Sequence, residues 1–278
     1  MTVDAHHHLW NPARIALPWM TAEHKLIARP FEPPELEPLL AEAGVAKTVL
    51  VQSANRDDDT DYMFEIAAGL DWVGGIVAWL PLTEPRARRR LDELLERPKL
   101  RGIRHLIHDE PDPHWILQAS VAPGLELIES AQLVLELPCV YPNHLGDVPE
   151  LARRYPQMRI VIDHLGKPPL GTRHMAHWAD LLGAAAELPN VYAKVSGLNT
   201  ATPSHDWDAR DLEPAVRVAV DAFGPGRLVC GSDWPVALLN GDYLRVWRET
   251  TTAIERIAGE DSAEILTRTP AALYRLGE

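Results

Sequence analysis

The chain has 278 residues, of which 46% are hydrophobic and 24% charged, and its formal net charge is −13. This composition indicates a globular protein with a substantial core and excludes a disordered chain. The negative charge argues against a nucleic-acid-binding protein, because phosphate groups are neutralised by clustered Lys and Arg. No apolar run approaches the ~20 residues that span a bilayer, and no signal-peptide pattern is present. We therefore expect a cytoplasmic protein without membrane or nucleic-acid partners.

Short β-branched segments recur along the chain, and nearly every one is followed by a segment of helical periodicity. The expected strands are residues 3–8, 48–52, 73–79, 100–106, 133–137, 160–164, 191–195 and 228–231. The expected helices are residues 35–42, 59–68, 86–96, 115–129, 148–155, 175–187, 212–223 and 243–257. This alternation predicts an α/β fold with parallel strands, which closes most economically as a single-domain (β/α)8 TIM-like barrel over residues 1–278. An open, doubly wound sheet is the alternative, but no glycine-rich nucleotide motif follows any strand.

Residues 11–34 form a long segment without a predicted helix or strand, and they include prolines at positions 12, 18, 30, 33 and 34. Long loops without secondary structure of their own are usually functional in compact domains. We expect this segment to lie over one mouth of the barrel as a lid loop.

His6 and His8 are separated by one residue in the first predicted strand. Successive side chains of a strand point to opposite faces, so both imidazoles are expected to face one space while His7 points away from it. At the end of a barrel strand that space is the carboxyl-terminal mouth, where barrel enzymes carry out their chemistry. A pair of imidazoles there is a typical ligand set for a divalent metal. A polar strand end is the simpler alternative.

His164 and Asp233 are expected at the same mouth, at the ends of the sixth and eighth predicted strands. Asp233 follows an apolar run that offers no partner of opposite charge. Because burying an unpaired carboxylate is costly, Asp233 is expected to meet a metal, a cation or a substrate. A helix N-cap is the alternative, but Trp234 and Pro235 make a poor helix start.

Five motifs, found in order along almost the entire chain, resemble those of the amidohydrolase superfamily. They are Val3-Asp-Ala-His-His-His-Leu-Trp10, Gly102-Ile-Arg-His105, Asp163-His-Leu-Gly-Lys-Pro168, Lys194-Val-Ser-Gly197 and Gly231-Ser-Asp-Trp-Pro235. The resemblance is to the amidohydrolase 2 type, in the lactonase branch that contains L-fuconolactonase, L-rhamnonolactonase and 4-sulfomuconolactonase.

The resemblance implies that four residues are both catalytic and metal-ligating: His6, His8, His164 and Asp233. In such enzymes the aspartate activates water to open a small lactone, here expected to be a sugar-acid lactone. The carbonyl is polarised by a metal or by the histidine cluster itself. The chain lacks the bridging lysine that binuclear relatives carry, and Glu136 is placed short of the rim. At most one divalent metal ion, zinc, is therefore expected, and metal-free catalysis stays open.

Other polar residues near the predicted strand ends are candidates for binding the hydroxyl groups of a lactone substrate. They are Arg104, His105, Tyr141, His144, Ser196 and Trp234. The alternative is that Arg104 pairs with Asp109 or Glu110 and that His144 caps the next helix. The expected partner is a small-molecule lactone, and the oligomeric state is left open.

Two other kinds of hydrolase are not favoured. A serine hydrolase would need a GxSxG motif, which is absent, because Val195-Ser196-Gly197 lacks the first glycine. Cys139 and Cys230 lie in or beside predicted strands with no predicted activating base, so we expect buried, reduced thiols. The remaining alternatives are a metal-dependent decarboxylase of the same superfamily and a non-catalytic barrel that binds a sugar acid.

Overall fold

A computed structural model describes residues 2–277 and contains one eight-stranded sheet in the order β1 to β8, with every neighbouring pair parallel. The strands are β1 (Thr2–His7), β2 (Val45–Val51), β3 (Val73–Ala78), β4 (Leu100–Arg104), β5 (Val134–Leu137), β6 (Arg159–Ile162), β7 (Val191–Val195) and β8 (Leu228–Cys230). All eight overlap the predicted strands. Because β-branched and Leu residues dominate these short segments, their burial on both faces explains why they read as continuous apolar runs.

The sheet closes between its first and last strands. The backbone N–H of His8 donates to the carbonyl of Trp234 at 2.6 Å, and that of Asp233 donates to the carbonyl of His6 at 2.8 Å. His7 and Trp234 form an isolated parallel bridge. The predicted barrel is confirmed, and its closing contacts involve the residues expected at the catalytic mouth.

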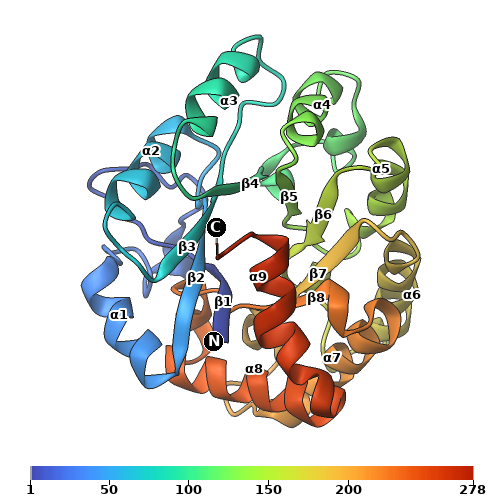
Figure 1. Ribbon diagram of the computed structural model, residues 1–278. Helices are drawn as coiled ribbons and strands as arrows, with labels where there is room; N and C mark the ends of the chain where they lie inside the picture. Colours follow the sequence, from blue (N-terminus) through green and yellow to red (C-terminus); the bar gives the residue numbers. More distant parts are fainter. Residues whose placement is uncertain (1, 278) are drawn as a thin grey trace.

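Helices surround the barrel (Figure 1). They are α1 (Pro33–Glu42), α2 (Asp57–Ile66), α3 (Ala87–Leu95), α4 (Ala122–Ser130), α5 (Val148–Arg154), α6 (Met175–Ala186), α7 (Ala209–Phe223), α8 (Tyr243–Ala258) and α9 (Thr269–Leu273). The helix predicted over 115–129 is divided into a 3-10 turn at Trp115–Leu117 and α4, because Pro123 fits only the first turn of a helix. None of the helices within residues 2–277 is long and apolar enough to cross a membrane.

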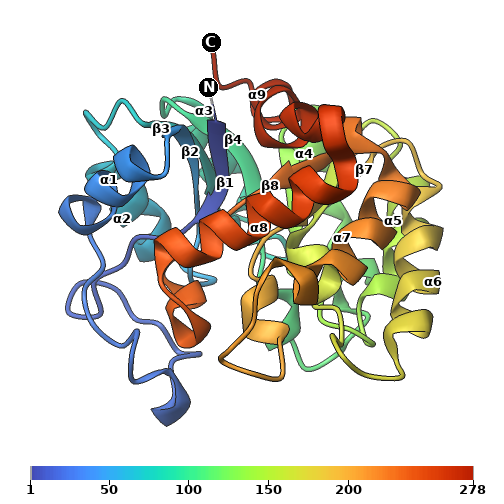
Figure 2. The ribbon, with the colours of Figure 1, turned by 90° about the horizontal axis from the view of Figure 1, so that it is seen from below.

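The unpredicted helix α9 lies across the end of the barrel at which the strands begin, close to both chain termini (Figures 1 and 2). Its last residue, Leu273, and the following residue, Tyr274, are buried among the valines of the barrel interior. The opposite end, at which the strands finish, is surrounded by long loops that include the segment after β1 (Figure 2). One end of the barrel is therefore sealed by apolar packing, and the loop-covered end is left for the site.

The barrel interior changes from apolar to polar along the strands. Val134 and Val161 belong to the interior apolar cluster, and the inward position two residues later is Glu136 in β5 and Asp163 after β6. The ammonium of Lys194, in β7, contacts both carboxylates, which places Lys194 at the same level of the barrel. The period of two in a strand thus places a charged layer directly above the apolar layer.

Candidate active site

His6 and His8 lie side by side at the end of β1. Their Nε2 atoms are 3.2 Å apart, and both rings are buried. His7 points away, with its Nε2 atom 2.8 Å from the hydroxyl of Thr48, as the alternation predicts. A register shift between Asp4 and His7 marks an irregularity in this strand. Irregular pairing re-aims side chains next to active sites, so the position of the His6 ring depends on the local backbone as well as on alternation.

His164 and Asp233 follow β6 and β8 in left-handed backbone conformations, with φ values of 52° and 61°. Non-glycine residues rarely adopt this conformation, and it is found mainly where the surrounding structure requires it, as in active sites. The carboxylate Oδ1 of Asp233 lies 3.7 Å, 3.5 Å and 3.8 Å from Nε2 of His6, His8 and His164, respectively. The four residues predicted to form the catalytic centre are therefore brought together around one carboxylate oxygen.

The charge state of this cluster follows from its burial. Burial lowers the pKa of His164 to about 4, which leaves its ring neutral at neutral pH. Burial alone raises the pKa of Asp233, but His164, His8 and His6 outweigh this effect and hold the pKa well below its usual range. The other oxygen of Asp233, Oδ2, is buried without a hydrogen-bond partner among residues 2–277. Asp233 is thus an ionised carboxylate with an unused acceptor.

Behind His6 lies a second set of buried charges, which the sequence analysis did not assign. Lys194 contacts Glu136 at 2.8 Å and Asp163 at 3.2 Å, and its Nζ atom is 3.0 Å from Nδ1 of His6. Arg104 donates to Asp163 at 2.9 Å. Lys194 and Asp163 both stand inside motifs that were noted, but their spacing does not indicate that they meet.

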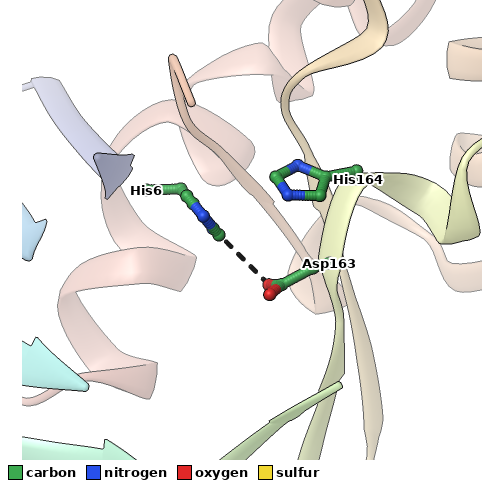
Figure 3. A group of neighbouring side chains, drawn as sticks. All are labelled: His6, Asp163 and His164. Atoms are coloured by element: carbon green, nitrogen blue, oxygen red, sulfur yellow. Dashed lines mark ion pairs between the residues drawn. The ribbon is translucent and has the colours of Figure 1, made fainter. Parts of the chain in front are cut away.

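Asp163 supports His6 from below (Figure 3). Its Oδ1 atom is 3.5 Å from Nδ1 of His6, and the His164 ring lies beside them, with its centroid 4.6 Å from that of His6. Burial raises the pKa of Asp163, but Lys194, His6 and Arg104 hold it well below its usual range. Burial and the nearby Lys194 lower the pKa of His6 well below that of a free histidine. His6 is therefore a neutral ring between charged groups.

The cluster contains positions that fit a divalent metal. Ligand atoms about 2.0–2.1 Å from a tetrahedral zinc ion lie about 3.3 Å from one another. The separations among His6 Nε2, His8 Nε2 and Asp233 Oδ1 are 3.2, 3.5 and 3.7 Å. Together with the unpartnered Oδ2 of Asp233, this donor set fits a cation. His6, Asp163 and His164 form a second group of this kind, but Asp163 is already engaged by Lys194 and Arg104.

A cavity of about 320 Å³ opens beside the cluster at the loop-covered end. Its lining includes His8, His164, Asp233 and Arg104, and the apolar part of its wall includes Trp10 and Trp19. Trp19 and His24, which also lines the cavity, belong to the segment 11–34. This segment therefore forms part of the cavity wall, whereas its closure as a lid stays a prediction.

The six predicted substrate-binding residues do not all line the cavity. Arg104 lines the cavity and pairs with Asp163, not with Asp109 or Glu110. Ser196 lies behind His164, with its hydroxyl 2.8 Å from Nδ1 of that ring. Ser196 thus contacts the site through a histidine and is not part of the cavity lining.

The other four lie outside the cavity lining. His105 is buried, accepts from the indole of Trp79 and faces Glu110. The Tyr141 hydroxyl is 2.9 Å from His177. His144 contacts the backbone of residue 140, and Trp234 is buried in the core. Substrate contacts from these four positions stay predictions.

Both cysteines are buried and free, as expected. Cys139 lines the cavity, but burial raises the pKa of its thiol far above the usual range. A thiol without thiolate character is a poor nucleophile, so the cavity offers no cysteine chemistry.

The amidohydrolase family model matches residues 3–276. The chain belongs to the amidohydrolase family. Among curated relatives, the L-fucono-1,5-lactonase of Burkholderia ambifaria is 39% identical over 241 residues, covering 87% of this chain and 82% of the relative. The L-fucono-1,5-lactonase of Burkholderia multivorans is 31% identical over 100% of this chain and 97% of the relative. The predicted family and its lactonase branch are confirmed.

Solved structures agree with this membership. An amidohydrolase from Burkholderia multivorans with bound HEPES superposes with a TM-score of 0.92 at 30% identity, over 99% of each chain. A second structure of a B. multivorans amidohydrolase, with bound zinc, gives a TM-score of 0.91 at 31% identity, again over 99% of each chain. The 5-carboxyvanillate decarboxylase of Sphingomonas paucimobilis, at 16% identity and a TM-score of 0.67, shares the fold.

Proposed function

We propose that this amidohydrolase opens a sugar-acid lactone, with Asp233 accepting a proton from the attacking water. The observation that carries the proposal is the position of Asp233: it is ionised, lines the cavity, and is surrounded by three imidazoles while one oxygen has no partner among the described residues. Two lactonases at 31% and 39% identity support the reaction class.

The proposed reaction needs one water and balances within the site. Water attacks the acyl carbon of the lactone as Asp233 takes one of its protons, and the carbonyl oxygen becomes an oxyanion. The ring C–O bond then breaks, and the leaving alkoxide takes the proton back from Asp233. The product is an open hydroxy acid, which ionises at neutral pH and releases a proton to the solvent.

The cavity wall carries cations that can stabilise the oxyanion. Arg104 and Lys167 are the cations among the lining residues described, and Asp109 and Asp233 are the anions. Cations held in a partly buried site stabilise a developing oxyanion more strongly than they do in water. Because the positive and negative groups balance in number, a neutral, hydroxylated ring fits this cavity better than a doubly charged one.

His6, His8 and Asp233 would hold a divalent metal, with His164 next to them. A metal bound there would act as a Lewis acid on the carbonyl and lower the pKa of a bound water. The protein contributes the orientation of the ligands: the Nδ1–H of His8 donates to the carbonyl of Val51 at 2.8 Å, which leaves Nε2 of His8 as an acceptor facing the site.

A pH-indicator assay of acid release tests the proposal. The parent protein is given a panel of aldonolactones that includes L-fucono-1,5-lactone, before and after chelation, beside Asp233→Asn. Acid release confined to a few sugar lactones, and lost in the variant, supports the proposal. Failure to turn over any lactone, with or without added Zn²⁺, overturns it, and carbon dioxide release from carboxylated aromatics would then identify a decarboxylase.

A further inference from the structure

Lys194 is a buried cation that the proposed reaction does not use. Its side chain is fully buried within the barrel, and its ammonium has three partners. They are Glu136 at 2.8 Å, Nδ1 of His6 at 3.0 Å and Asp163 at 3.2 Å. Two of its three N–H groups donate to Glu136 and to His6, and its contact with Oδ1 of Asp163 is an ion pair.

This arrangement determines where the hydrogen of the His6 ring lies. Because an ammonium only donates, Nδ1 of His6 must accept from Lys194, and a neutral imidazole then carries its hydrogen on Nε2. The acceptor for that hydrogen is Nε2 of His8 at 3.2 Å, since Nδ1 of His8 already donates to a backbone carbonyl. Nη1 of Arg104 also lies 3.4 Å from Nε2 of His6, and with its two N–H groups it faces both that atom and Asp163 at 2.9 Å. Of the two neighbours of Nε2, His8 at 3.2 Å is the closer, and a hydrogen on Nε2 directed at His8 gives a chain of donors from Lys194 through His6 to His8.

The same arrangement opposes metal binding by His6, since a metal needs a free lone pair on Nε2. That lone pair becomes available if the ring hydrogen moves to Nδ1, where Asp163 Oδ1 at 3.5 Å is the acceptor (Figure 3). A carboxylate that accepts from the far nitrogen is the usual support for a metal-bound histidine. Lys194 and Asp163 thus compete for the same atom of His6.

We propose that Lys194 is a positioning residue that controls metal binding at this site: its ammonium holds His6 in the Nε2–H tautomer, and His6 ligates a metal only when the Lys194–His6 hydrogen bond is exchanged for a His6–Asp163 hydrogen bond. The inference rests on the proposed use of His6, His8 and Asp233 as one site.

Metal affinity measured without substrate tests this inference separately from the lactonase proposal. Zn²⁺ binding to the chelator-treated protein is measured in competition with a chromophoric chelator. Lys194→Met removes the ammonium, and Lys194→Met/Glu136→Gln removes the buried ion pair together, so that no carboxylate is left unpaired by the change. Tyr274→Phe is the matched control, because Tyr274 donates to Glu136 in the same network without touching His6.

Both Lys194 variants are expected to bind Zn²⁺ at least about tenfold more tightly than the parent, the scale on which such supporting contacts alter metal affinity. Tyr274→Phe is expected to stay within about threefold of the parent. If Lys194→Met fails to fold, as judged by circular dichroism, the double variant carries the test. Folded Lys194 variants that bind no more tightly than the parent overturn the proposal, and so does an equal gain in Tyr274→Phe.

The tautomer of His6 gives a second readout that requires no variant to fold. Long-range ¹H–¹⁵N spectra of the metal-free parent distinguish Nε2–H from Nδ1–H rings, and His6 is assigned by the signal missing in His6→Asn. We expect the Nε2–H pattern in the parent and the Nδ1–H pattern in the Lys194 variants. An Nδ1–H ring in the parent overturns the proposal.

Discussion

Gly197 lies so close to Asp233 that a Cβ atom at position 197 would be 2.5 Å from Oδ2 of Asp233 and 2.9 Å from Nδ1 of His164. We therefore expect Gly197→Ala to displace both side chains and to lower kcat/KM by about 100-fold, the usual effect of misplacing reacting groups by an ångström. The variant should also be less stable by about 1–2 kcal/mol, because residue 197 has a φ of 61°. Kinetics and chemical denaturation measure the two effects.

Gly171→Ala is the control for Gly197→Ala, because it strains the backbone without crowding a neighbouring side chain. Gly171 has a φ of 71°, but the nearest atom to its added Cβ is Cγ of Pro203 at 3.6 Å, an ordinary contact. This control should lose similar stability and keep the activity of the parent. Equal activities in the two variants would show that the close approach of Gly197 does not position Asp233.

Asp233→Asn tests the proposed base directly. An amide cannot accept a proton from water at neutral pH, so we expect kcat to fall about 10²–10⁴-fold with the fold retained. The acid-release assay measures the loss, and thermal denaturation checks the fold. Residual activity within about tenfold of the parent, a barrier change of only ~1.4 kcal/mol, would remove Asp233 from this role.

Asp109→Asn is the matched control for Asp233→Asn. Asp109 lines the same cavity, but its side chain is 43% exposed and lies apart from the histidine cluster, 3.8 Å from His108. Removing its charge changes the cavity potential without touching the proposed base. We expect kcat within about threefold of the parent, which would attribute the loss in Asp233→Asn to proton transfer and not to net charge.

The barrel was predictable because its signal is local. Alternation of short apolar strands with amphipathic helices is repeated along the chain, and each β-branched run carries its own evidence. Helix α9 was not predicted because it has only five residues. Its burial depends on packing against the end of the barrel, a contact that no local sequence pattern encodes.

The site was predictable in part for the same reason. His6, His8, His164 and Asp233 stand at strand ends, where topology alone brings them together. Lys194 and Asp163 lie 31 positions apart in sequence, and their contact depends on the relative height of β6 and β7 in the barrel. His105 shows the opposite case, because a polar residue at a strand end was turned away from the cavity by Trp79 and Glu110.

His105 should affect stability more than substrate binding. Its ring stacks on Trp115 at a centroid distance of 4.2 Å, and burial lowers its pKa. As pH falls below about 6.5, the unfolded chain takes up a proton that folded His105 does not, so stability falls by up to about 1.4 kcal/mol per pH unit. His105→Gln does not titrate and should lose less stability between pH 7 and pH 5 than the parent. Urea denaturation at both pH values measures the difference.

The KM of His105→Gln distinguishes a packing role of His105 from a role in substrate binding. The variant should keep the KM of the parent within about threefold, although lost ring contacts make it less stable at pH 7. A KM raised tenfold or more would return His105 to the substrate-binding residues. Parallel stability curves for parent and variant between pH 7 and pH 5 would contradict the buried, neutral ring.

Trp19 tests whether the segment after β1 contributes to substrate binding. Its indole lines the cavity, donates to the carbonyl of Ser53 at 2.7 Å and packs edge-on against Trp10. Trp19→Ala removes an apolar surface on which the C–H face of a sugar ring can rest, so we expect KM to rise about tenfold, equivalent to ~1.4 kcal/mol. Because the Trp19 indole offers no group that accepts a proton from water, kcat should change less than KM.

Leu26→Ala provides the comparison within the same segment. Leu26 is 67% exposed and lies outside the cavity lining, so its truncation should leave both KM and stability nearly unchanged. Steady-state kinetics on the best lactone of the panel measure both variants. An unchanged KM in Trp19→Ala would show that the substrate does not reach this wall, and an equal rise in Leu26→Ala would indicate a general loosening of the loop instead of a lost contact.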